Sequence, residues 1–352
     1  MLLSKTEVNI LLTAGFYKAV PANLSPDLGG NALKELFDLK LLKLNRSKTT
    51  CRLTNKGISL LAAAGYNFRP DKHPLGDSDM LIRRLQSAEI ALALQQIGVD
   101  VFLKDLPRTP GGNKYLSAYA LRRNSCSNIL GMAKFNGYYF APETTYIIYH
   151  LSSKLSGFYP NTESETFIRH MQSIESDWQI LFVGGKDYEE MFDLLHRKKE
   201  SGKKNDGNFL DMVDMFSNVG ALPLNSAGLR TLRIMNTPDY KERIVKYFKN
   251  TDTTGKNTIA DGFHEGQCMQ VNLDNNLNRQ GNALKHYKNI HLIMPEQDSY
   301  WTCGDSEINR VTLSIDKMEE ILDIGKPQNP DFNAFIGKNG KAIQGESGCA
   351  YA

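Results

Sequence analysis

The sequence contains no long hydrophobic run. No window of about eighteen residues is apolar enough to cross a bilayer, so we expect no transmembrane helix. The first residues, MLLSKTEVNILLTAG, lack a basic leader and a small-residue cleavage site, so we expect no secretory signal peptide. The five cysteines of the 352-residue chain are scattered, odd in number and never arranged as C-x-x-C, which indicates reduced thiols in a cytoplasmic protein.

The sequence also lacks a complete nuclease motif. A metal-dependent endonuclease needs a carboxylate at a strand end and an acidic-x-Lys triplet on the next strand, to bind magnesium and activate water. Lys134 and Glu143 lie on opposite sides of a predicted turn and form no such triplet. Asp239-Tyr240-Lys241 has the spacing, but it opens a predicted helix, where an aspartate favours the helix dipole.

Relaxase and nucleotide-binding motifs are missing as well. A rolling-circle relaxase needs a His-x-His metal cluster beside a nucleophilic tyrosine, and none of the seven histidines forms that pair. Tyr138, Tyr139, Tyr146 and Tyr149 alternate along predicted strands, which is typical of sheet packing, although Tyr138 and Tyr139 could also stack on an unpaired base. The stretch TGKNT at Thr254 lacks the first glycine of a phosphate loop. We therefore predict no catalytic residue and no cofactor.

Metal-ligand residue types occur near one another without a recognised spacing. His264 and Cys268 lie in HEGQC, with His291 and Cys303 further along the chain. Isolated histidines and cysteines are commoner than zinc sites, and this spacing matches no zinc pattern. We predict no metal site.

Positive charge, by contrast, is concentrated at the N-terminus. Residues 1–75 hold 11 Lys or Arg and 5 Asp or Glu, a net charge of +6, within a chain whose total is +3. The remaining residues hold 31 basic and 34 acidic side chains, a net charge of −3. This asymmetry indicates that the N-terminal segment meets phosphate.

The N-terminal pattern predicts a compact run of short elements. Ser4 should cap a first helix, the NLSPDLGG stretch should form a short helix or turn, and a further helix should cover residues 31–39. Residues 41–45 and 49–53 read as two strands joined by Arg46-Ser47-Lys48, and Thr54 should cap a last helix that Gly65 ends.

This order of elements is that of a winged helix-turn-helix. The stretch from Ala32 to Gly65 resembles the wing of multiple-antibiotic-resistance and PadR-type regulators, with Thr54 and Gly57 at matching places. The resemblance implies that the helix lies in a major groove, where Asn31 could pair with adenine and Lys34 with guanine or phosphate, while the wing meets the backbone. A winged helix used only for protein contacts is the alternative. The predicted DNA-binding residues are Asn31, Lys34, Lys43, Arg46, Lys48, Arg52 and Lys56.

The rest of the chain reads as helices alternating with strands. A polar linker precedes an amphipathic helix at residues 80–97 and a strand at 100–104. Two β-rich runs flank Asn136-Gly137, which predicts a type I′ hairpin, and a third run at 144–151 extends it to a meander. Further predicted helices are 163–173, 187–199, 226–235, 239–249 and 316–322, and further strands are 178–184, 219–225, 288–294 and 308–315, with a polar loop at 250–270.

Helix, meander, helix, strand and helix are compatible with a restriction-endonuclease-like core. Together with the leading winged helix, the chain from residue 1 to about 250 resembles the replication-relaxation family of plasmids and conjugative elements, on the winged helix, the following helix, the hairpin and the GFYPNTESETFIRHMQ segment. The predicted class is α+β, with a winged helix at 1–68, a linker at 69–79 and a mixed-sheet α/β domain at 80–325. That domain would comprise a core at 80–250 and a less regular extension at 251–325, and a flexible tail would follow at 326–352.

The family resemblance implies a DNA-binding accessory protein in replication, relaxation or mobilisation. Its expected partners are double-stranded DNA, a relaxase or replication protein, and a second copy of the chain, with no membrane contact. A metal-dependent DNA-nicking enzyme and a winged-helix transcriptional regulator are the alternatives. A second phosphate contact could come from a basic loop that is otherwise read as solvated. Its residues are Arg197, Lys198, Lys199, Lys203 and Lys204.

Overall fold

The computed structural model shows an α+β protein with mixed sheets. It describes residues 2–69, 79–103, 112–124, 134–142, 144–151, 161–163, 178–196, 211–216, 218–296, 308–325 and 334–335. The chain divides into two compact units, residues 1–96 with 328–352 (unit 1) and residues 97–327 (unit 2). The predicted linker at 69–79 and tail at 326–352 lie almost entirely outside the described residues.

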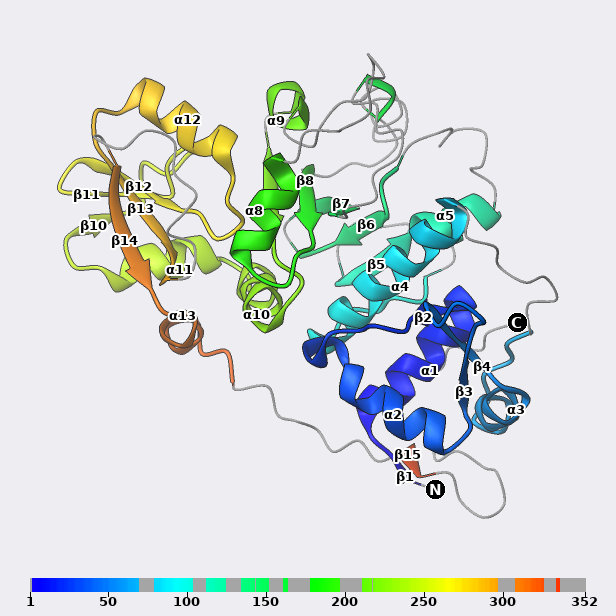
Figure 1. The fold of residues 1–352 in the computed structure, drawn as a ribbon. Helices are drawn as coiled ribbons and strands as arrows, with labels where there is room; N and C mark the ends of the chain where they lie inside the picture. Colours follow the sequence, from blue (N-terminus) through cyan, green and yellow to red (C-terminus); the bar gives the residue numbers. More distant parts are fainter. Residues whose placement is uncertain are drawn as a thin grey trace. The chain divides into compact units, whose positions relative to one another are not determined.

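Unit 1 contains short helices around a three-stranded antiparallel sheet of order β2-β4-β3 (Figure 1). Its elements are β1 (Leu2–Leu3), α1 (Lys5–Tyr17), β2 (Val20–Pro21), the 3-10 helix η1 (Pro26–Leu28), α2 (Gly30–Asp38), β3 (Leu42–Leu44), β4 (Thr50–Leu53), α3 (Asn55–Ala63), α4 (Asp79–Gln96) and β15 (Ala334–Phe335). β1 pairs with β15.

The helix boundaries of unit 1 follow from capping residues. Ser4 and Glu7 form a capping box at the start of α1, in which the Ser4 amide donates to Glu7 Oε2 at 2.6 Å. Thr54 caps α3 through the Gly57 amide at 3.1 Å, and Gly65 follows that helix with a φ of 90°. The predicted caps and helix end are confirmed.

The core of unit 1 lies between α1, α2 and the sheet. Ile10, Leu11, Tyr17, Leu36 and Leu41 are fully buried. α4 packs on α1, and a buried hydrogen bond from Gln95 Nε2 to Thr13 Oγ1, 2.8 Å long, joins the two helices. Because α4 belongs to this core, unit 1 extends beyond the small N-terminal segment.

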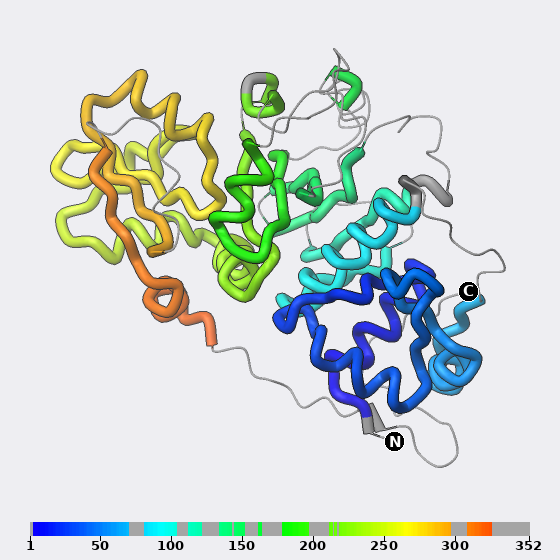
Figure 2. Tube along the Cα trace, viewed as in Figure 1, coloured from blue at the N-terminus to red at the C-terminus, as the bar shows by residue number. Residues whose placement is uncertain are grey.

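Unit 2 contains two five-stranded sheets, and the trace in Figure 2 completes the first before entering the second. The first sheet comprises β5 (Lys114–Ser117), β6 (Gly137–Phe140), β7 (Thr145–His150), β8 (Trp178–Val183) and β9 (Val219–Leu222). The second comprises β10 (Thr251–Asp252), β11 (Gly262–His264), β12 (Gln267–Val271), β13 (Ile290–Pro295) and β14 (Ile308–Leu313). The helices are α5 (Ala118–Asn124), α8 (Tyr188–His196), α9 (Asp211–Met215), α10 (Ser226–Met235), α11 (Tyr240–Tyr247), α12 (Leu277–His286) and α13 (Ile315–Ile321).

The two sheets have the same topology. In each, strands one, two and three pair antiparallel in chain order, and strands three, four and five pair parallel. In each, a helix follows the last strand, α10 in the first case and α13 in the second. We call residues 114–235 the first module and residues 240–321 the second module.

The registers of the two sheets also agree residue by residue. Gly137 begins the second strand of the first module and pairs with Ile148, which pairs with Leu181. Gly262 begins the second strand of the second module and pairs with Met269, which pairs with His291. Each remaining position in the paired strands of the first module can therefore be matched with one position in the second module.

The outer edge of β9 is covered by the loop that follows β12. The Ala221 amide donates to the Asp274 carbonyl at 2.7 Å, and Asn275 Nδ2 donates to the Ala221 carbonyl at 3.1 Å. A Cβ on Gly220 would lie 2.6 Å from the Asp274 carbonyl oxygen, so glycine lets this loop approach. The second module thereby completes the edge of the first sheet.

The predicted hairpin at Asn136-Gly137 is wrong. Neither residue has a positive φ, which a type I′ turn requires, and Gly137 lies inside a strand between β5 and β7. β6 instead ends at Phe140 and β7 begins at Thr145, and between them the Ala141 amide donates to the Thr144 carbonyl at 3.0 Å.

Two further predictions are corrected. Residues 101–103 form no strand, and Asp100 makes only a single bridge, to Lys114. The polar stretch predicted as a loop at 250–270 contains β10, β11 and the start of β12, because its turn residues, including Glu265 and Gly266 at positive φ, join short strands. Of the predicted helix at 163–173, only residue 163 is described, and it is helical.

Candidate functional site

The hairpin formed by β3 and β4 has a turn held by one side chain. Asn45 Oδ1 accepts from the amides of Thr49 at 2.9 Å and Thr50 at 3.1 Å, and its Nδ2 donates to Ser47 Oγ at 2.7 Å. The Lys48 amide donates to the Asn45 carbonyl, and Lys48 has a φ of 56°. These bonds fix the turn, so Arg46 and Lys48 extend from an ordered backbone.

The same hairpin carries four positively charged side chains. Lys43 lies directly opposite Arg52 in the strand pairing, an arrangement in which like charges repel. Arg46 and Lys48 are exposed at the turn, and Nε of Arg52 is buried without a hydrogen-bond partner. Within the described part of the chain, none of these four cations forms an ion pair. We call residues 42–53 the basic hairpin.

The exposed face of α2 is of mixed charge. Asn31, Lys34, Glu35 and Asp38 are exposed and spaced so that they share one side of the helix. At its start, Gly29 has a φ of 92°, and a Cβ on Gly30 would lie 2.2 Å from the Leu24 carbonyl oxygen. Gly29 is therefore the N-cap of α2 and Gly30 its first residue, and Asn31 and Lys34 are the predicted contact residues that α2 presents.

Lys56 has a structural partner. Its Nζ donates to the Leu39 carbonyl at 2.9 Å, and Thr54 Oγ1 donates to the Lys40 carbonyl at 2.7 Å. Both bonds satisfy carbonyl groups at the C-terminal end of α2, where a cation also favours the helix dipole. The predicted second DNA contact, Arg197, Lys198, Lys199, Lys203 and Lys204, lies outside the described residues.

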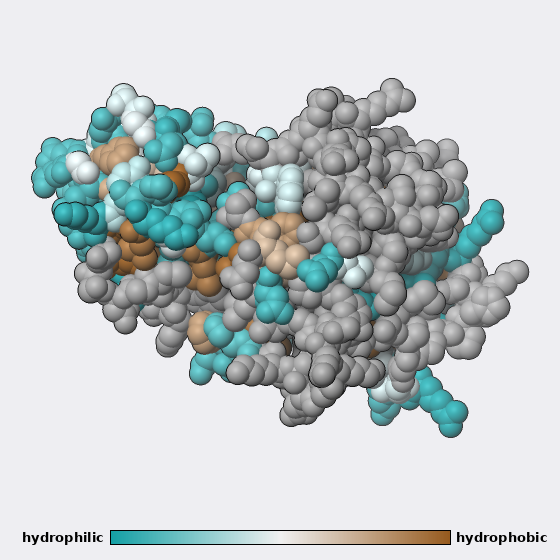
Figure 3. Space-filling model, turned by 90° about the horizontal axis from the view of Figure 1, so that it is seen from above, coloured by the Kyte–Doolittle hydropathy of each residue, from teal (hydrophilic) through white to brown (hydrophobic). Residues whose placement is uncertain are grey.

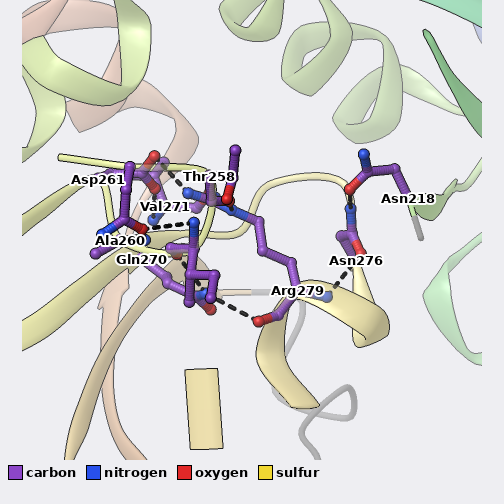
Figure 4. Close-up of polar contacts among 10 residues, drawn as sticks. Asn218, Thr258, Ala260, Asp261, Gln270, Val271, Asn276 and Arg279 are labelled. Atoms are coloured by element: carbon purple, nitrogen blue, oxygen red, sulfur yellow. Dashed lines mark hydrogen bonds and ion pairs between the residues drawn. The ribbon is translucent and has the colours of Figure 1, made fainter. Parts of the chain in front are cut away.

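In unit 2, a buried polar cluster lies where β11, β12 and α12 meet, and we call it the second-module corner (Figure 4). Asp261, just before β11, binds Arg279 NH2 through Oδ1 at 2.5 Å and accepts the Val271 amide through Oδ2 at 2.7 Å. Gln270 Nε2 donates to the carbonyls of Ile259 at 2.6 Å and Arg279 at 3.0 Å. Both carboxylate oxygens of Asp261 are thus engaged.

Arg279 is fixed by more than its ion pair. Its Nε donates to the Thr258 carbonyl and its NH1 to the Val271 carbonyl, both at 3.2 Å. Burial is the largest single influence on its pKa and lowers it, but the attraction and hydrogen bond of Asp261, together with Tyr240 and Asp274, raise the pKa above its usual value. The guanidinium therefore stays charged in this corner.

The first module has a corner of the same geometry with different chemistry. Asn136, just before β6, accepts the His150 amide through Oδ1 at 2.8 Å, as Asp261 accepts that of Val271. Tyr149 aligns with Gln270, and its hydroxyl donates to Glu163 at 2.8 Å. Glu163 lies in the described helical residues 161–163, between β7 and β8, and Arg279 lies in α12, between β12 and β13.

Among the described residues, neither corner holds the carboxylate and acidic-x-Lys set of a metal-dependent nuclease. Asp261 is a carboxylate at a strand end, but the next strand, Gln267–Val271, contains no acidic-x-Lys triplet. Asp239 precedes α11 with a φ of 55°, and Lys241 Nζ lies 5.7 Å from the centroid of the Tyr240 ring. Lys134 donates its backbone amide to Glu163, and Glu143 lies outside the described residues.

The four tyrosines of β6 and β7 pack within the first sheet. Tyr138, Tyr139 and Tyr149 are at most 1% exposed and Tyr146 is 4% exposed, so their ring faces are closed to a nucleobase. Tyr139 stacks on Tyr146 with ring centroids 5.7 Å apart. Sheet packing is confirmed, and the base-stacking alternative is wrong.

The metal-type residues of the second module divide between the two faces of its sheet. Cys268 is fully buried in an apolar cluster with Ala260, Ala283 and Ile290, and burial raises the pKa of its thiol to about 12. His264 and His291 lie together on the other face, and Cys303 is outside the described residues. Among the residues that the structure describes, no group of three or more His, Cys, Asp or Glu could hold a metal ion.

The described surface is mainly hydrophilic, with scattered hydrophobic spots in the view of Figure 3. The large hydrophobic residues that stand exposed in the described ranges are Leu44, Met215 and Tyr247. No helix among the described residues is long and apolar enough to cross a membrane.

Comparisons with protein-family models, with curated proteins and with solved structures found no match. The sequence patterns did not indicate Asp261, Gln270 and Arg279, because the hydrogen bonds among these residues depend on which strands pair. Asn45 was missed as well, although an asparagine followed by Ser and Thr within a short turn is a signal for side-chain hydrogen bonds to the backbone.

Proposed function

We propose that unit 1 is a winged helix that binds duplex DNA, with the basic hairpin as its wing. The order α1, β2, α2, β3, β4, α3 supports this reading, as does the pairing of β2 with the hairpin. The observation that carries the proposal is the unpaired positive charge of Lys43, Arg46, Lys48 and Arg52 on a hairpin whose turn is held by Asn45. Placing like charges opposite each other costs folding energy, and phosphate would offset that cost.

In this proposal the hairpin and α2 have different tasks. The hairpin supplies phosphate contacts, which give affinity without sequence preference. The exposed face of α2 carries two acids beside Asn31 and Lys34, so it contributes little to phosphate binding. Its chemistry suits base edges instead, since Asn pairs with adenine and a carboxylate accepts from cytosine.

For unit 2 we propose attachment to a relaxase or replication protein of a plasmid or conjugative element. Its antiparallel meander, helix and parallel strand support a kinship of both modules with the restriction-endonuclease-like core. The engagement of both Asp261 oxygens within the protein favours this accessory role over DNA nicking. A DNA-binding accessory protein is the function that these observations support best.

Changing Arg46 and Lys48 together to alanine should weaken binding to a 30-bp random-sequence duplex by about 10-fold and reduce the salt slope by about 1.8, because two phosphate contacts are lost. Fluorescence anisotropy between 50 and 200 mM salt measures both quantities. The matched control replaces the exposed unit 2 residues Lys285 and Lys288 by alanine, which removes the same charge. Equal weakening by the control, or unchanged binding in the hairpin variant, would refute the wing contact.

Changing Asn31 to alanine should alter sequence preference instead. Selection from a random duplex pool should show reduced adenine preference at one position, by about 1–3 kcal/mol of discrimination. Lys5→Ala, at an exposed position of α1, provides the comparison. An equal loss of affinity for selected and random duplexes would contradict a base-reading role for Asn31.

A further inference from the structure

Two histidines of the second module lie side by side on one face of its sheet. His264 is in β11 and His291 in β13, and their ring centroids are 5.4 Å apart at an interplanar angle of 87°. Both side chains are partly exposed. Two imidazoles bound to one tetrahedral ion through nitrogen, at zinc–nitrogen distances of about 2.0–2.1 Å, would have centroids about 5 Å apart.

Each ring is oriented through its Nδ1 atom. His264 Nδ1 lies 3.0 Å from the Lys249 carbonyl oxygen, to which it can donate. Asn309 Nδ2 lies 2.9 Å from His291 Nδ1, and exchanging the oxygen and nitrogen of this side-chain amide would let Oδ1 accept from Nδ1 and leave Nε2 of His291 unprotonated for metal binding. A histidine that hydrogen-bonds a carbonyl through Nδ1 presents Nε2 as the ligand atom, which is how protein ligands of zinc are commonly held. Nε2 of His291 is buried and has no hydrogen-bond partner among the described residues.

The fold itself does not require histidine at either place. By the shared register, His264 aligns with Tyr139 of the first module and His291 aligns with Leu181. Those residues are buried and form part of the first core. Where the first module has two buried core residues, the second module thus has two partly exposed imidazoles in edge-to-face contact.

We propose that His264 and His291 form an open binding site for a divalent transition-metal ion such as Zn²⁺ or Ni²⁺. Imidazole nitrogen suits both ions. The described residues supply two protein ligands, so water or a donor atom from another molecule completes the coordination. Cys268 takes no part, because its position in β12 places it on the opposite face of the sheet, in the apolar cluster.

The test is calorimetric titration of the full chain with ZnCl₂ and, separately, NiCl₂, together with thermal melts at 1 mM EDTA or 50 μM metal. The variants are His264→Tyr and His291→Leu, which carry the residues of the first module and so preserve packing. The control is His286→Ala, an exposed histidine at the end of α12.

The wild-type chain and His286→Ala should bind one ion and melt about 2–4 °C higher with metal. Each site variant should bind at least 10-fold more weakly and lose the shift, while melting normally in EDTA. No metal-dependent shift in the wild type, or an unchanged shift in the variant that carries both His264→Tyr and His291→Leu, would overturn the proposal and leave the pair as an edge-to-face ring contact. These readouts use no DNA and are independent of the proposed function.

Discussion

Replacing Arg279 by methionine should lower the free energy of unfolding of unit 2 by about 3–5 kcal/mol, because it leaves a buried carboxylate without its cation. The side chains of Arg279 and Asp261 are only 10% and 8% exposed, so water cannot take over the lost contacts. The substitution also removes the donors to the Thr258 and Val271 carbonyls. Urea unfolding followed by tryptophan fluorescence measures the effect, since both tryptophans, Trp178 and Trp301, belong to unit 2.

The matched double variant, Asp261→Asn with Arg279→Met, should recover most of that loss. Asparagine occupies the same position in the first module, where Asn136 accepts the His150 amide through Oδ1. The neutral pair removes the uncompensated charge while keeping the hydrogen bond to Val271. A single variant that loses less than about 1 kcal/mol, or a double variant no more stable than the single one, would show that the ion pair is not what stabilises this corner.

Alanine at Gly137 or Gly262 should destabilise unit 2 by about 1–3 kcal/mol in each case. These glycines begin the second strand of the two modules, and the first strand passes close to both. A Cβ at Gly137 would lie 2.7 Å from the Leu116 carbonyl oxygen, and one at Gly262 would lie 2.9 Å from that of Asp252. Backbone cannot yield as a flexible side chain can, so both changes should shift the sheets.

Gly281→Ala provides a control that should change stability in the opposite direction. Gly281 lies within α12, and its added Cβ would meet nothing within 4 Å. Alanine is favoured over glycine in a helix interior by about 0.8–1.0 kcal/mol, so this variant should be stabilised. If Gly137→Ala, Gly262→Ala and Gly281→Ala shifted the urea midpoint in the same direction, close packing at the strand starts would not explain the first two.

Local signals in the sequence predict much of unit 1. The capping pair Ser4 and Glu7, the cap Thr54 and the terminating Gly65 act on their own neighbours, so the helices they delimit can be read without tertiary information. The basic turn at Arg46 and Lys48 can also be predicted from the sequence, because it too depends on neighbouring residues. The attachment of α4 to this unit depends on packing against α1, which no local pattern reports.

The strand order of unit 2 could not be predicted from the sequence. Asn136-Gly137 has the composition of a tight turn, yet tertiary contacts place it at a strand start, where Gly137 admits Tyr115 and Leu116 and Asn136 binds a neighbouring strand. The same contacts recur at Asp261-Gly262, in a stretch that composition alone assigns to a loop. Gly137 and Gly262 occupy the same aligned position, but most other aligned side chains of the two modules differ. The similarity of the modules is therefore visible only in the register of their strand pairing.

The loop that covers β9 has a consequence for how the chain is made. Residues 274 and 275 leave the ribosome after β9, so the nascent first sheet presents an open edge of hydrogen-bonding groups until they appear. A fragment that ends between residues 223 and 273 keeps that edge permanently, beside fully buried strand residues such as Ile180 and Leu222. Synthesis of the second module therefore ends the interval in which the first sheet is exposed to edge-to-edge aggregation.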